Sequence, residues 1–125
     1  MSKHDLVLSN VGDVNLYITL PHTAVISNNI VNFSVSLYTS DSISHIFAEN
    51  NLSAVKSGSN LTFKRSIGDD SFLKNKQLEI MFHTIPSGGE IAINCQVQLT
   101  DQDDNTLLNI TEQITTTVDS VIVNF

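Results

Sequence analysis

The residues of this chain whose types and spacing best suit chemistry lie in one acidic segment, Asp101-Gln102-Asp103-Asp104-Asn105. Asp101, Asp103 and Asn105 fall at positions 1, 3 and 5 of the EF-hand calcium loop, and Glu112 falls at position 12. All four side chains carry oxygen atoms, which are the ligands that a hard divalent cation prefers. The spacing therefore identifies Asp101, Asp103, Asn105 and Glu112 as candidate Ca²⁺ ligands.

The same segment departs from the EF-hand pattern in two respects. Thr106 occupies the position where the pattern needs a glycine for a sharp turn. Both flanks alternate between apolar and polar residues, whereas an EF-hand requires helices there. The alternative is a hairpin turn whose Asp and Asn side chains bond their own backbone. Two interpretations stay open, a purely structural turn with no cofactor and a weak Ca²⁺ site at one end of a β-domain.

The flanks of this turn carry the clearest structural signal in the chain. Apolar residues alternate with polar ones before the turn and again after it, which is the period of a β-strand with one buried face. The apolar positions are Ile91, Ile93, Cys95, Val97, Leu99, Leu108, Ile110, Ile114 and Val118. The pattern predicts an antiparallel hairpin, and it places the only cysteine, Cys95, in the core as a small hydrophobic residue.

Short segments with similar alternation recur along the whole chain and predict seven to nine strands. They span residues 5 to 11, 14 to 20, 30 to 39, 43 to 48, 60 to 67, 77 to 85, 90 to 100, 107 to 118 and 120 to 125. The polar run Glu49-Asn50-Asn51 is typical of a connection, and residues 69 to 76 can form one helical turn. We expect residues 1–125 to form a single all-β domain, an antiparallel two-sheet sandwich of immunoglobulin-like type, with a jelly roll as the alternative.

The charge of the chain restricts its partners. Thirteen acidic residues against six basic ones give a formal net charge of -7, which disfavours nucleic acids and anionic lipid surfaces. Five of the six basic residues lie between residues 56 and 76. Among them, Lys64, Arg65, Lys74 and Lys76 are candidate interaction residues that can meet the acidic turn of a neighbouring copy.

Two aromatic residues complete the set of candidate interaction residues. Tyr17 and Tyr38 fall on the polar faces of their predicted strands, where an amphipathic ring can serve binding or cover a neighbouring side chain.

Nothing in the sequence points to catalysis. The four histidines are scattered, and no nucleophile motif, glycine-rich phosphate loop or Cys-His pairing is present. We therefore expect a protein that is not an enzyme. The chain contains no signal peptide and no apolar run long enough for a membrane helix. Its compartment is not indicated, and an extracellular, surface or virion location is expected if the chain is an excised module or is released without a signal peptide.

Three segments are distinctive when taken together, namely Asp5-Leu6-Val7-Leu8-Ser9-Asn10-Val11, Phe33-Ser34-Val35-Ser36-Leu37-Tyr38 and Gly58-Ser59-Asn60-Leu61-Thr62-Phe63. They resemble bacterial cell-adhesion-related immunoglobulin-like modules. The Asn-x-Gly stretch that is typical of the family after its third strand is missing here. The resemblance implies a spacer or adhesive module without catalytic residues. We expect a non-enzymatic module for protein contact or self-association, with a Ca²⁺-dependent or glycan-binding module, its site in the end loops including 101–105, as the alternative.

Overall fold

The protein is an all-β sandwich of two sheets in the computed structural model, which describes residues 1–20, 30–39, 45–53, 61–85 and 91–125. Nine strands and one short helix lie in these residues, so the strand number agrees with the sequence-based expectation. They are β1 (Ser2–Asp5), β2 (Asp13–Leu20), β3 (Ile30–Thr39), β4 (His45–Ser53), β5 (Leu61–Asp69), α2 (Asp70–Leu73), β6 (Lys76–Ile85), β7 (Ile93–Thr100), β8 (Thr106–Ile114) and β9 (Val118–Asn124).

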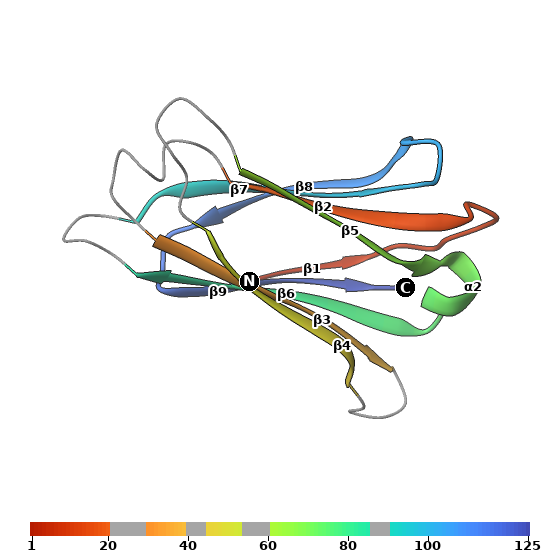
Figure 1. The fold of residues 1–125 in the computed structure, drawn as a ribbon, viewed down its shortest axis with the longest axis horizontal. Helices are drawn as coiled ribbons and strands as arrows, with labels where there is room; N and C mark the ends of the chain where they lie inside the picture. Colours follow the sequence, from red (N-terminus) through yellow and green to blue (C-terminus); the bar gives the residue numbers. More distant parts are fainter. Residues whose placement is uncertain (21–29, 40–44, 54–60, 86–90) are drawn as a thin grey trace.

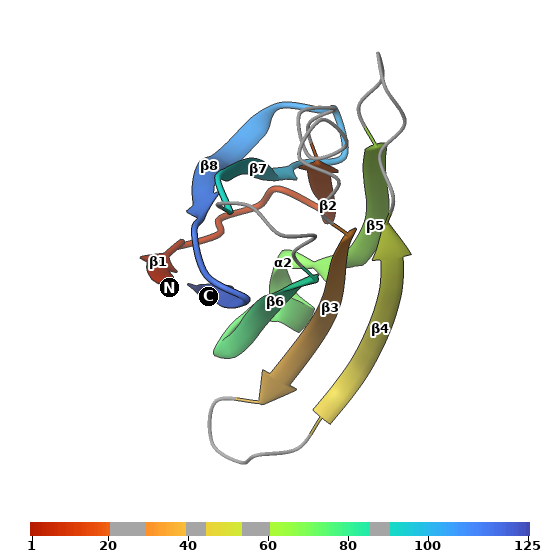
Figure 2. The same ribbon diagram turned by 90° about the vertical axis from the view of Figure 1, so that its left-hand side faces the viewer.

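The strands form two layers, seen one above the other in Figure 1 and from the end in Figure 2. Sheet A has five strands in the order β1-β9-β6-β3-β4, and sheet B has four in the order β5-β2-β7-β8. All neighbouring pairs are antiparallel except β1 and β9, which run parallel. The chain crosses between sheets after β1, β2, β4, β5, β6 and β8, which interlocks the two layers. The immunoglobulin-like subtype remains a prediction.

One face of each sheet supplies the core. Alternate side chains on β2, β3, β6, β7, β8 and β9 are buried between the layers. Removing this apolar surface from water stabilises the fold by about 25 cal/mol per Å². The fully buried large side chains are Val14, Leu16, Ile18, Leu20, Leu37, Leu73, Leu78, Ile80, Phe82, Ile93, Leu99 and Ile114.

The predicted hairpin is confirmed in β7 and β8. Val97 pairs with Ile110, and the apolar side chains of both strands point into the core. Cys95 is fully buried, as expected, and desolvation by burial, followed by the charge of Glu112, raises the pKa of its thiol to about 12. The thiol therefore stays protonated at neutral pH and serves as a small apolar side chain in the core.

Three boundaries differ from the sequence-based expectations. The strand predicted over residues 5 to 11 is wrong, because β1 ends at Asp5 and residues 6–12 carry the chain over to β2 in the other sheet. Glu49-Asn50-Asn51 is not a connection but part of β4, where antiparallel pairing with β3 overrides its low strand propensity. The strand predicted over residues 107 to 118 ends at Ile114, and residues 115–117 carry the chain across to β9, which begins at Val118.

Left-handed backbone positions gather at the end of the sandwich that carries α2. Among the described residues, those with positive φ at this end are Asn10, Gly12, Gly68, Asn75 and Asp104. Gly68 has φ of 116°, and a Cβ atom there would lie 2.4 Å from the Phe72 ring. The expected helical turn is α2, which Asp69 caps by accepting a 2.7 Å hydrogen bond from the backbone N–H of Phe72.

Candidate functional site: the two outer faces of the sandwich

The outer face of sheet B, here called the B face, consists of amide and hydroxyl side chains. The residues of β2 and β7 that alternate with the core point outward, and so do those of the flanking strands β5 and β8. The members of this face are Asn15, Tyr17, Thr19, Thr62, Lys64, Ser66, Asn94, Gln96, Gln98, Asn109, Thr111 and Gln113. Lys64 is the one charged side chain among them.

Cross-strand contacts order several of these side chains. The Tyr17 hydroxyl donates to Asp104 Oδ1 at 3.3 Å, which ties the B face to the turn at its edge. Gln96 Nε2 donates to Asn109 Oδ1 at 3.0 Å. Side chains held in this way lose less conformational entropy when a ligand binds.

Tyr17, Lys64 and Asp104 form a small charged cluster at one corner of the B face. The Lys64 ammonium lies 5.3 Å from the centroid of the Tyr17 ring, within the range of a cation–π interaction. The pKa of Lys64 is raised, first by its hydrogen bond with the Tyr17 side chain and also by the negative charge of Asp104. The single cation of the face therefore has a partner in its own chain.

The outer face of sheet A has a different character, because apolar side chains are exposed at one corner of it. Val118 is 51% exposed and Ile85 is 54% exposed. Val118 on β9 pairs with His83 on β6, and Met81 and Ile85 lie two residues before and after His83 on the same face of β6. Met81 and Val118 line one open recess of about 280 Å³. We call Met81, Ile85 and Val118 the apolar corner.

The acidic turn is a hydrogen-bonded hairpin turn in which Asp101 is the organising residue. Asp101 Oδ1 accepts from the backbone N–H of Asp103 at 2.8 Å and of Asn105 at 2.9 Å. Its Oδ2 accepts from Asn105 Nδ2 at 3.1 Å. The pKa of Asp101 is lowered, chiefly by the backbone hydrogen bond from Asn105. Both carboxylate oxygens of Asp101 thus accept hydrogen bonds within the turn, as expected of a purely structural hairpin turn.

The structure does not bring Glu112 to this turn. Glu112 lies six residues along β8 from Thr106, which corresponds to about 20 Å at ~3.4 Å per residue. In the described part of the chain, no three acidic, histidine or cysteine side chains lie close enough together to hold a metal ion. The strand conformation that the alternation predicts is therefore what separates Glu112 from the other three candidate ligands.

Glu112 instead faces inward, between the two sheets. Its carboxylate and that of Asp119 on β9 are both about nine-tenths buried, and the α-ammonium of Met1 lies 3.7 Å from Glu112 and 2.7 Å from Asp119. These three groups close the side of the sandwich where β8 faces β1 and β9.

The two carboxyl groups have opposite pKa shifts. Desolvation raises the pKa of Glu112, and the nearby Asp119 raises it further. Burial also acts to raise the pKa of Asp119, but hydrogen bonds from the Met1 ammonium, from Glu112 and from the Ser120 backbone outweigh it and lower the pKa below its usual value.

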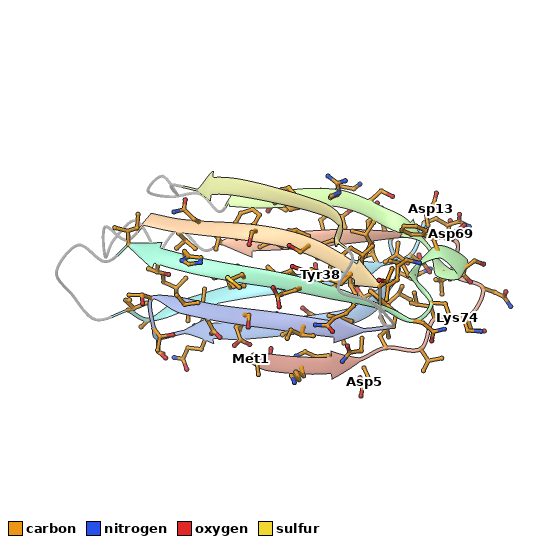
Figure 3. All side chains as sticks on the ribbon, turned by 90° about the horizontal axis from the view of Figure 1, so that it is seen from below. Met1, Asp5, Asp13, Tyr38, Asp69 and Lys74 are labelled. Carbon is orange, nitrogen blue, oxygen red and sulfur yellow. The ribbon has the colours of Figure 1, made fainter. Side chains whose placement is uncertain are left out.

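The predicted basic residues do not gather into one patch. Lys64 lies on the B face, whereas Arg65 faces inward opposite Leu16. Lys74 and Lys76 follow α2, at the same end as the acidic turn, and Figure 3 shows Lys74 at the end that carries Asp13 and Asp69. The basic residues therefore lie on different faces, and the contact of basic residues with the acidic turn of another copy stays a prediction.

Sequence reasoning placed the two tyrosines on outward faces, which the structure confirms, but they lie on opposite sides of the molecule. Tyr38 belongs to β3 and sheet A, which faces the viewer in Figure 3. The amides of the B face were missed as a group, although they are the polar half of the same alternation that identified the core. The apolar corner was missed because the alternation assigned Val118 to the buried face of the hairpin, which is wrong since Val118 begins β9 and is exposed, and because Ile85 carries no motif.

We predict that Ca²⁺ does not stabilise this protein, because both Asp101 oxygens already accept hydrogen bonds and Glu112 lies far away. The midpoint of thermal unfolding should stay within about 1 °C between EDTA and millimolar Ca²⁺, measured by differential scanning fluorimetry, with Mg²⁺ as the control ion. A rise of several degrees that Asp101→Asn abolishes would restore the calcium interpretation.

The opposite shifts of Glu112 and Asp119 predict opposite pH dependence. A raised pKa in the folded state means that Glu112 stabilises below its ordinary value of 4.5 and that this contribution is lost as pH rises through its folded-state pKa. Glu112→Gln should therefore be more stable than wild type at pH 8, by on the order of 1 kcal/mol, and equal to it near pH 4.

Asp119→Asn is the matched variant, for which we expect the opposite change in stability. Its lowered pKa means that the Asp119 contribution is present above 3.8 and is lost as pH falls, so this variant should be less stable than wild type at pH 7. Urea unfolding at several pH values measures both effects. Equal, pH-independent losses in the two variants would show that the pair acts only through packing.

No family model matches this chain, and neither the curated proteins nor the solved structures contain a match to it.

In the described residues, no helix is long and apolar enough to cross a membrane.

Proposed function

We propose that the chain is a non-enzymatic module that makes protein contacts, including contacts with a second copy of itself. The observation that carries the proposal is the apolar corner of sheet A, where Ile85 and Val118 are each about half exposed and Val118 lines a recess together with Met81. Exposed apolar groups that cluster beside a recess are typical of protein interaction sites, whereas isolated ones are not.

The chemistry of this corner suits a protein partner. A flexible methionine beside branched side chains adapts to an apolar partner surface, and methionine is enriched in protein interfaces. The corner lies at the ends of β6 and β9, which are interior strands of sheet A and pair with each other there. The resemblance to adhesion-related modules supports the same class of function.

A second copy is the partner that can be tested directly. We expect concentration-dependent association in sedimentation velocity experiments, and we expect Val118→Asp to weaken it by at least about tenfold, since a desolvated charge at an apolar contact costs more than ~1.4 kcal/mol.

Val7→Asp is the matched control, because Val7 is 92% exposed but lies near α2, away from the apolar corner. It should associate like wild type. A wild-type protein that is monomeric at all concentrations, or an equal loss in both variants, would contradict self-association through this corner.

A further inference from the structure

We propose that the B face binds a neutral glycan chain. This inference is independent of the proposed protein contact, which uses the opposite sheet. The carrying observation is that the described outward side chains along the middle of all four strands of sheet B are amides, hydroxyls, one tyrosine and one lysine, while the exposed acids Asp13 and Asp69 lie at the end that carries α2.

The hydrogen-bonding chemistry of the B face matches that of sugar hydroxyls. A sugar hydroxyl both donates and accepts, and Asn, Gln and Thr side chains likewise offer donors and acceptors. Gln98 lies opposite Tyr17 on one side and Asn109 on the other, so three strands present polar groups in one row. Neighbouring strands are ~4.8 Å apart, so such a row offers hydrogen-bonding groups at regular intervals to a ligand lying across it.

A second row runs parallel to the first. Thr19 pairs with Thr62 on one side and with Gln96 on the other, and the two threonine hydroxyls lie 3.4 Å apart. Gln96 also joins the two rows, because its amide donates to Asn109. The two rows together form a continuous polar surface with partly fixed side chains.

The charge of the surface selects a neutral ligand. Lys64 is its one cation and already faces Tyr17 and the nearby Asp104, whereas phosphate or sulfate groups are recognised by clusters of basic residues. The chain as a whole carries a formal charge of -7, which repels polyanions further. A sulfated, phosphorylated or uronic-acid-rich chain is therefore disfavoured.

The composition of the B face favours a glycan over a protein. The cores of protein interfaces are enriched in aromatic residues, methionine and arginine, and Tyr17 is the only such side chain among the described members of this face. Tyr17 supplies one ring edge or face for a sugar ring, while amides supply most of the contact.

The test measures binding of neutral hexasaccharides by isothermal titration calorimetry. The probes are cello-, xylo-, manno- and laminarihexaose, with a galacturonic acid hexamer as the acidic counterpart. We expect at least one neutral hexaose to bind, and we expect Gln98→Ala to weaken that binding by on the order of tenfold, as loss of ligand hydrogen bonds does. The acidic hexamer should bind more weakly or not at all.

Gln77→Ala is the matched control, because Gln77 is also a half-buried amide but lies on the outer face of sheet A. It should bind like wild type, and thermal unfolding checks that both variants are folded. The inference is overturned if no neutral hexaose binds at millimolar concentration, if the acidic hexamer binds best, or if both variants lose binding equally. Self-association that Val118→Asp weakens would leave the proposed function standing in each of these cases.

Discussion

Alternation of side chains across two packed sheets is the constraint on which the rest of this structure depends. The strands β2, β3, β6, β7, β8 and β9 each give one face to the core, so polar groups that can bind or react are left on the outer faces, at the edges and at the ends. The outer faces then differ because their residues differ. Sheet B exposes amides and hydroxyls, while sheet A exposes apolar side chains at the corner formed by Met81, Ile85 and Val118.

The same alternation places charged side chains on the inner faces of two edge strands, where they disfavour pairing with another chain. Edge strands expose backbone groups that can pair with another chain, and inward-pointing charges discourage such pairing. Glu112 lies on the inner face of the edge strand β8, and Arg65 lies on the inner face of the edge strand β5. Contacts through the faces, rather than addition of a strand at these two edges, are consistent with this arrangement.

The sequence predicts the strands well where apolar and polar residues alternate strongly. It fails where pairing with a neighbouring strand, or the path of the chain between sheets, determines the strand boundaries. The β7–β8 hairpin and buried Cys95 follow from periodicity alone. The strand at Glu49-Asn50-Asn51 does not, because pairing with β3 determines it. The candidate calcium ligands matched a loop pattern in sequence spacing, but an extended β8 carries Glu112 away from Asp101. The two outer faces are visible in the sequence only as the residues left over once the core is assigned.

Mapping of ¹H–¹⁵N NMR chemical shifts while the protein concentration is raised tests most directly whether the two outer faces have separate roles. We expect the concentration-dependent chemical shift changes to cluster around Met81, Ile85 and Val118, and we expect the backbone signals of Gln96 and Gln98 to stay unchanged. Concentration-dependent shifts spread over sheet B or confined to the acidic turn, with an unaffected apolar corner, would contradict it.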